Sequence, residues 1–169
     1  MRPKGMADDR DTTFVEYVAA HMVQLRRTAY LLCGDWARGD DLVQRALTEV
    51  YVRWDRIREA GSLDAYIRAV LVHRFIDDRR RAWARVRLVA AVPDRAAPEA
   101  GDPAARLDLR SALARLPARQ RAVLVLRFFC DQSVEQTAEA LGCAPGTVKS
   151  QTSLGLAAMR RLLTQTEKT

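Results

Sequence analysis

A stretch rich in proline and glycine divides this chain of 169 residues into two parts. Residues 92–105 contain three prolines and one glycine, and after Val92 they contain no large apolar side chain. Proline and glycine interrupt regular structure, so this stretch is predicted to be a linker. The length allows two small domains. The sequence therefore predicts a disordered N-terminus over 1–11, domains over 12–87 and 107–165, and a flexible linker over 88–106.

Apolar residues recur at three- and four-residue steps on both sides of the linker, which is the spacing of one helical face. The pattern runs from Phe14 to Leu25 and again from Leu42 to Ile57. Residues 39–41, Gly-Asp-Asp, are expected to supply the cap and first-turn carboxylates of the second of these helices. Ser62 is expected to cap a third helix. Because no stretch alternates with period two for long, the predicted fold class is all-α.

Positive charge is concentrated in the third helix. Lysine and arginine outnumber aspartate and glutamate by 28 to 21, a formal charge of +7. Residues 68–87 carry a net charge of +5. A solvated helix face is the plain explanation, but guanidinium groups also bind phosphate bidentately. Trp83 lies among them, as a packing residue or as a ring that stacks on unpaired bases. The sequence favours nucleic acid over an anionic membrane surface as the ligand of these arginines: Arg68, Arg74, Arg79, Arg80, Arg81, Arg85 and Arg87.

Several other classes of function lack support in the sequence. No apolar run approaches the roughly 20 residues of a membrane-spanning helix, so no membrane insertion is expected. The three cysteines form no CxxC pair, and we expect free thiols and no zinc site or cofactor. Adjacent helical residues point about 100° apart, so Asp77 and Asp78 are expected to pair with Arg74 and Arg81 rather than hold a metal. Nothing indicates an enzyme, although a nuclease using these aspartates is an alternative.

The second part contains the pattern of a helix-turn-helix. Ser133 and Gln136 fit a capping box, Gly142 suits the end of the first helix, and Pro145 suits the first turn of the next. A generic helical hairpin would share some of these signals. In the DNA-binding motif the N-terminal residues of the second helix enter the major groove. This prediction places donors for phosphates and base edges at Lys149, Ser150, Gln151 and Ser153.

The ordered set of motifs resembles an extracytoplasmic-function (ECF) RNA polymerase sigma factor, of the actinobacterial SigE-like type. The motifs are LRRTAYLLCGD at 25–35, DDLVQ at 40–44 with Trp54, LPARQRAVLVLR at 116–127 and GTVKS at 146–150. The resemblance covers residues 14–163 and implies a sigma-2-like helical bundle followed by a sigma-4-like helix-turn-helix domain. It implies as partners core RNA polymerase, through its β′ clamp and β flap, promoter DNA and an anti-sigma factor, all in the cytoplasm.

The resemblance also assigns residues to each partner. Polymerase docking is assigned to six residues of the helix after residue 39: Asp40, Asp41, Leu42, Gln44, Leu47 and Glu49. The two leucines belong either to the docking surface or to the core. Capture of a flipped base of the −10 element and of its strands is assigned to Gly61, Ser62, Tyr66, His73, Arg74, Arg79, Arg80 and Arg81. Reading of the −35 element is assigned to Arg119, Arg127, Thr147, Lys149, Ser150, Gln151 and Ser153.

Two promoter elements roughly 50–60 Å apart must then be held by two domains that, when free, tumble or collapse together. The sequence departs from the family pattern at His73, where asparagine is frequent in the −10-reading helix. It departs again at Ala144, where a serine usually caps the recognition helix. Leu154 and Leu156 stand where arginine is frequent, which should weaken the grip on phosphate, and Leu154 could instead meet a protein partner. The rival interpretation is a stand-alone helix-turn-helix regulator, which would have no use for the motif at 40–44.

Overall fold

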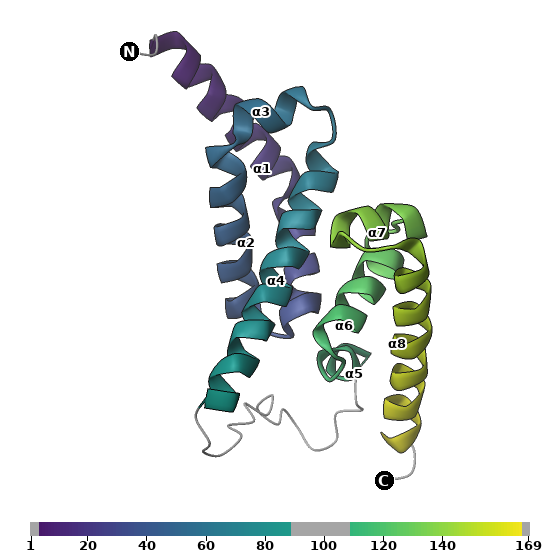
Figure 1. Ribbon diagram of the computed structural model, residues 1–169. Helices are drawn as coiled ribbons and strands as arrows, with labels where there is room; N and C mark the ends of the chain where they lie inside the picture. The colour runs from purple at the N-terminus through teal and green to yellow at the C-terminus, as the bar shows by residue number, and fades with distance from the viewer. Residues whose placement is uncertain (1–3, 89–108, 167–169) are drawn as a thin grey trace.

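The computed structural model describes residues 4–88 and 109–166, and every regular element within them is helical. The predicted all-α class is confirmed. From residue 89 onward the predicted linker lies outside the described residues. Figure 1 shows two helical groups side by side. The elements are α1 (Lys4–Cys33), α2 (Trp36–Val52), α3 (Trp54–Glu59), α4 (Leu63–Leu88), α5 (Leu109–Ala114), α6 (Ala118–Leu124), the π-helical turn η1 (Val125–Phe129), α7 (Val134–Leu141) and α8 (Pro145–Thr166).

The first group, which we call the N-unit, consists of α1 to α4. Its second helix begins earlier than predicted, because the Asp35 side chain accepts a hydrogen bond from the Arg38 backbone N–H at 2.8 Å and so caps the helix. The preceding residue, Gly34, has a φ of 73°, which ends α1. The prediction of a cap at residues 39–41 was therefore wrong, because that tripeptide lies inside α2.

The predicted disorder over residues 1–11 was also wrong in the described part, since α1 begins at Lys4. Two side chains of this segment bind the end of α2. The Arg10 guanidinium donates a hydrogen bond to the Tyr51 carbonyl oxygen and lies over the Tyr51 ring, 4.6 Å from its centroid. The Tyr51 hydroxyl in turn donates to the Asp11 carboxylate at 2.6 Å. These long-range contacts hold the first turns of α1 against α2. No local sequence pattern predicts them.

Gly39 marks a close approach of α2 to the backbone of α1. A Cβ atom at this position would lie 3.2 Å from the Tyr30 backbone nitrogen and 3.3 Å from the Ala29 carbonyl carbon. Backbone atoms of a packed helix cannot move aside as a flexible side chain can, so a larger residue must separate the helices.

We expect Gly39→Val to lower the free energy of unfolding by about 1–3 kcal/mol through overpacking. Urea unfolding followed by circular dichroism measures this change. Gly146→Val is the matched control, because a Cβ at Gly146 meets nothing within 4 Å. Equal losses in both variants would contradict the close-packing explanation.

The second group, the C-unit, consists of α5 to α8 and contains the predicted helix-turn-helix. The Ser133 hydroxyl accepts from the Gln136 backbone N–H at 3.0 Å, and the Gln136 side chain accepts from the Ser133 N–H at 2.9 Å. Gly142 adopts the left-handed conformation with a φ of 63°, and α8 begins at Pro145. The capping box, the glycine stop and the proline start are all confirmed.

The two units pack against each other along a seam formed mainly by α4 and α1 on one side and α5, α6 and α7 on the other. Arg121 of α6 lies in this seam and is 2% exposed. Its guanidinium donates to the Leu32 carbonyl oxygen at the end of α1, at 2.6 Å, and lies 5.5 Å from the centroid of the Phe75 ring of α4. It also donates to the carbonyls of Ala114 and Leu116 in its own unit. One apolar core therefore runs through both units.

Candidate nucleic-acid interface

The predicted docking residues on α2 fall into three groups. Asp41 and Gln44 are exposed on the surface of the helix. Leu42 is 1% exposed and belongs to the core, and Leu47 is half-buried against it. The structure thus decides the choice that the sequence left open for Leu42, which is unavailable to a partner. All three carboxylates of this set, Asp40, Asp41 and Glu49, lie in ion pairs with arginines.

Asp40 is paired with Arg26 of α1. The guanidinium donates two hydrogen bonds to the carboxylate, at 2.7 and 2.9 Å, and this pairing lowers the pKa of Asp40. Asp41 is paired in turn with Arg45 at 3.0 Å, but its side chain is the more exposed of the two aspartates, at 66% against 42% for Asp40. Arg26 belongs to the LRRTAYLLCGD motif at 25–35, and no site role is predicted for it from the sequence.

Two ion pairs connect α2 to the basic helix α4. Arg74 donates two hydrogen bonds to the Glu49 carboxylate, at 2.9 and 2.7 Å, so both of these predicted site residues are engaged within the N-unit. Asp78 accepts from Arg45 at 3.0 and 2.5 Å, which lowers the pKa of Asp78. The prediction that Asp78 pairs along its own helix was wrong. Arg45 is the partner because α2 packs directly on α4.

The end of α4 presents the arginine cluster to solvent. Arg80 and Arg81 are exposed, and Arg79 is half-buried. Trp83 is 65% exposed, so its ring is not a packing anchor within the described residues and is open to a stacking partner. His73 is exposed on the same helix. This surface suits a single strand, because cations can hold the phosphates while an aromatic face stacks on a base.

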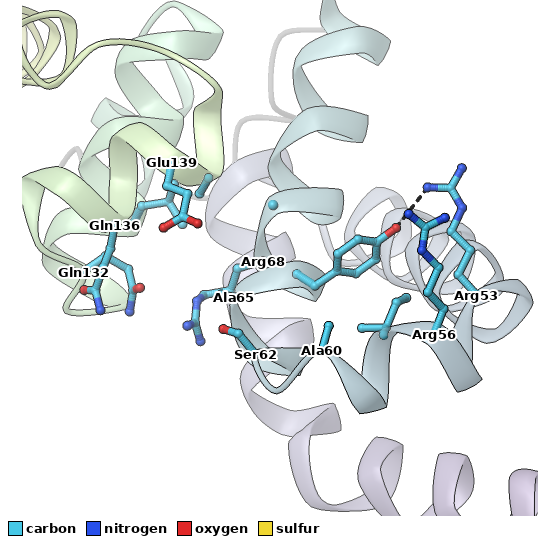
Figure 2. Close-up of a pocket in the computed structure, with 14 residues that line it drawn as sticks. Arg53, Arg56, Ala60, Ser62, Ala65, Arg68, Gln132, Gln136 and Glu139 are labelled. Carbon is cyan, nitrogen blue, oxygen red and sulfur yellow. Dashed lines mark hydrogen bonds between the residues drawn. The ribbon is translucent and has the colours of Figure 1, made fainter.

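A cavity of about 630 Å³ lies where the loop before α4 faces the C-unit (Figure 2). Ser62 and Tyr66, two of the predicted −10 residues, line it, and Gly61 forms the adjoining turn with a φ of 84°. The Tyr66 hydroxyl accepts a hydrogen bond from Arg53 at 3.0 Å. His73 and Arg74 do not line this cavity.

Three arginines of the N-unit line the same cavity: Arg53, Arg56 and Arg68. None of them was predicted to belong to the −10 site. Arg53 is the cap residue before α3 and Arg56 lies three residues later within α3. This i, i+3 spacing could have indicated a shared site. Arg68 was counted in the basic run but was not assigned to the −10 element. Together they make the N-unit wall of this cavity strongly cationic, as a phosphate-binding surface requires.

The start of α8 presents the predicted −35 residues. Lys149, Ser150 and Ser153 are exposed, whereas Thr147 and Gln151 are half-buried. The Ser150 hydroxyl donates to the Thr147 carbonyl oxygen at 3.0 Å. Arg119, also predicted to contact the −35 element, is exposed. Of the three departures from the family pattern in this unit, Ala144 is exposed, Leu154 is 53% exposed, and Leu156 packs against the small core of the C-unit.

Arg127, which is predicted to contact the DNA backbone, is bound within the C-unit. It is half-buried, its guanidinium donates to the Gln132 carbonyl oxygen, and it lies 5.7 Å from the centroid of the Phe128 ring. In this structure Arg127 supports the turn between η1 and α7. The reason is that the π-helical turn carries it towards the loop that precedes Ser133.

The described residues also bear on metal sites, cysteines and membrane-spanning helices. No group of three or more histidine, cysteine, aspartate or glutamate side chains there is placed to hold a metal ion. The three cysteines are free and half-buried, and burial raises the pKa of Cys33 to about 11. Within residues 4–88 and 109–166 no helix is long and apolar enough to cross a bilayer.

Comparisons with known proteins agree with this geometry. The family model "Sigma-70 region 2" matches residues 17–85, and "Sigma-70, region 4" matches residues 106–159. The chain is 37% identical over 164 residues to the RNA polymerase sigma-E factor of Streptomyces avermitilis, covering 94% of this chain and 89% of that protein. It is 35% identical over 150 residues to the ECF RNA polymerase sigma factor SigL of Mycobacterium tuberculosis, covering 85% and 84%.

A solved structure has the same arrangement of helices. It is the sigma factor RpoE of Bartonella quintana, crystallised in complex with the anti-sigma factor NepR. The TM-score is 0.70 at 25% sequence identity, and the match covers 90% of this chain and 97% of that one. The similarity therefore extends over both units.

Proposed function

This chain belongs to the ECF group of sigma-70 RNA polymerase sigma factors, which bind core polymerase and promoter DNA, and we propose which of its surfaces serves each partner. The chain acts as a specificity subunit in the cytoplasm and catalyses no reaction of its own. The observation that carries the proposal is the separation of three surfaces on one chain: an exposed polar face on α2, a cationic face on α3 and α4, and an exposed helix-turn-helix.

The polymerase clamp binds α2 through Asp41 and Gln44. Both side chains are exposed, and the buried Leu42 beneath them fixes the helix in the N-unit. Asp40 shapes this surface indirectly, because its ion pair with Arg26 fixes one edge of the helix.

Promoter DNA binds the other two surfaces. The loop at Gly61 and Ser62 with Tyr66 receives an unstacked base of the −10 element, and the arginines at the end of α4 hold the strand by its phosphates. Unstacking costs a few kcal/mol, which the cationic surface offsets. Lys149, Ser150 and Ser153 at the start of α8 read the −35 element as duplex DNA.

Run-off transcription with core RNA polymerase from a Streptomyces strain tests the function as a whole. We expect the chain to bind core polymerase and to direct initiation from a limited set of sites on genomic fragments, which mapping of transcript starts identifies. Absence of both core binding and specific starts would refute the proposal. Tight binding to duplex DNA with no effect on transcription would indicate the stand-alone regulator instead.

The docking surface has its own test. We expect Asp41→Lys to weaken core binding by about tenfold, the effect of losing a close interfacial charge pair worth about 1.5 kcal/mol or more. Glu16→Lys makes the same charge reversal on an exposed position of α1 and should leave core affinity unchanged. Biolayer interferometry on immobilised core polymerase measures both. Equal affinities for the two variants would exclude Asp41 from the interface.

A further inference from the structure

The loop between α3 and α4, residues 60–62, is exposed over its whole length. We call it the −10 loop, because it is proposed to receive the unstacked base. The helix before it, α3, has only 6 residues, and isolated helices shorter than about 12 residues are marginal in water. The shape of the −10 loop therefore depends on what holds α3 on one side and the first turn of α4 on the other.

Helix α1 carries a row of polar side chains that contacts both of these elements. Its members are four residues apart, so they lie on one face of the helix. We call them the polar row: Asp9, Thr13, Tyr17 and His21. Figure 1 shows α3 beside the N-terminal half of α1, against which it packs.

Thr13 holds α3. Its hydroxyl accepts hydrogen bonds from the Trp54 indole N–H at 3.1 Å and from the Arg58 guanidinium at 3.2 Å, and it donates to the Arg10 carbonyl oxygen at 3.0 Å. A hydroxyl can donate one hydrogen bond and accept two, so this group is fully used. Asp9 adds an ion pair with the same Arg58, at 3.7 Å. These contacts fix both ends of α3, because Trp54 begins the helix and Arg58 lies in its last turn.

Tyr17 holds the start of α4. Its hydroxyl donates to the Asp64 carboxylate at 2.6 Å, and Asp64 lies in the first turn of α4, directly beyond the −10 loop. The His21 ring stacks on the Tyr17 ring with 4.1 Å between centroids, and its Nε2 lies 3.5 Å from the same carboxylate. Burial and the hydrogen bond to Asp64 raise the pKa of Tyr17, so its hydroxyl stays protonated and remains a donor.

One face of α1 thus binds the segments on both sides of the −10 loop and leaves the loop itself open to DNA. Building on the function proposed above, we propose that the polar row is a positioning element for −10 recognition, in which Thr13 and Tyr17 set the shape of the loop that selects the base. Such support matters because a recognition site must be held within about 0.5 Å of its productive geometry. The proposed docking residues lie on a different helix, α2, so the polar row should affect promoter selection and not core binding.

Two substitutions remove single hydroxyl groups from the polar row. Tyr17→Phe loses the hydrogen bond to Asp64 and keeps the ring, whereas Thr13→Val keeps the shape of Thr13 and loses its three hydrogen bonds. Thr13→Ser is the rescue variant, because serine restores the hydroxyl. Tyr30→Phe and Thr164→Val are the matched controls, which lose the same groups near the C-terminal ends of α1 and α8.

The measurement is a ratio of run-off transcription, from a mapped promoter and from versions of it in which each −10 base is replaced in turn. At the position where the parent chain discriminates most strongly, we expect Tyr17→Phe and Thr13→Val to lower this ratio at least about fivefold, the factor that corresponds to one net hydrogen bond. Both controls should keep the parent's ratio, and Thr13→Ser should recover most of it. Core affinity, measured beside it, should equal the parent's in every variant.

A parent-like ratio in Tyr17→Phe would overturn the positioning role, and this variant decides the question alone if Thr13→Val does not fold. Transcription that falls by one common factor at every version of the promoter would also overturn it, because such a fall indicates lost stability and unchanged base selection. The parent chain tests the underlying function separately. If the parent neither binds core polymerase nor prefers any base in the −10 element, the proposed function itself is refuted, and the positioning role with it.

Discussion

Replacing Arg121 by alanine is expected to lower the free energy of unfolding by about 3–5 kcal/mol, because the variant leaves a cavity and unpaired carbonyl groups together. The guanidinium donates to three backbone carbonyls, those of Leu32, Ala114 and Leu116. Each of these lies at or near the end of a helix, where a carbonyl has no partner within its own helix. Burial lowers the pKa of Arg121 to about 10, so at neutral pH the group remains protonated and all its donors are present.

Two further variants separate the contributions at this position. Arg121→Leu refills most of the volume but supplies no donor, and we expect it to recover less than half of the lost stability. Arg121→Lys supplies a charge but cannot reach three carbonyls with one ammonium group, so it should also fall short. Urea unfolding monitored by circular dichroism measures all three.

Arg119→Ala is the control, since Arg119 is exposed on the same helix and its loss should change stability by less than about 0.5 kcal/mol. Buried charges can sometimes be replaced by apolar residues without loss. If Arg121→Leu unfolds at the same urea concentration as the parent chain, pairing of the carbonyls is not what Arg121 provides, and relief of its desolvation outweighs the lost hydrogen bonds.

The parts of the fold that depend on local signals were predictable from the sequence. The capping box at Ser133, the stop at Gly142 and the start at Pro145 each involve residues within a few positions of one another, and all three are present. The helical periodicity was enough to indicate the all-α class. The arginines at the end of α4 were also predictable as an exposed charged surface, because a concentration of one charge cannot be buried.

Contacts between distant segments were not predictable in the same way. The partners of Asp78 and Glu49, which are Arg45 and Arg74, follow from how α2 packs on α4, and sequence spacing does not contain that information. The start of α2 was misplaced because residues 39–41 resemble a helix start as strongly as Asp35 does, although the cap is made by the Asp35 side chain. The seam between the units could not be predicted either, because Arg121 and the Leu32 carbonyl that it binds are 89 residues apart in the sequence.

Removing the arginine cluster at the end of α4 is expected to abolish most promoter opening. The triple variant Arg79→Ala, Arg80→Ala and Arg81→Ala takes away three cations, two of them exposed. If each arginine holds a phosphate through a charge-assisted hydrogen bond worth about 1.5 kcal/mol, full loss of the three bonds weakens the open complex by a factor of about 10³. Because neighbouring cations compensate in part, we expect a loss of about 10²–10³. Permanganate reactivity of unpaired thymines at a mapped promoter measures the opened fraction.

The salt dependence of the same complex separates phosphate binding from a loss of folding. Each contact with single-stranded DNA contributes about −0.7 to the slope of log affinity against log salt concentration, so the triple variant should flatten that slope by about 2. Replacement of the three arginines by lysine keeps the charge and should restore most of the slope, though less of the affinity, because lysine lacks the bidentate fork. Core binding should stay constant in both variants, since the docking face on α2 is separate from this cluster. An alanine variant that opens promoters with the parent's efficiency and salt slope would show that the strand takes another path across the N-unit.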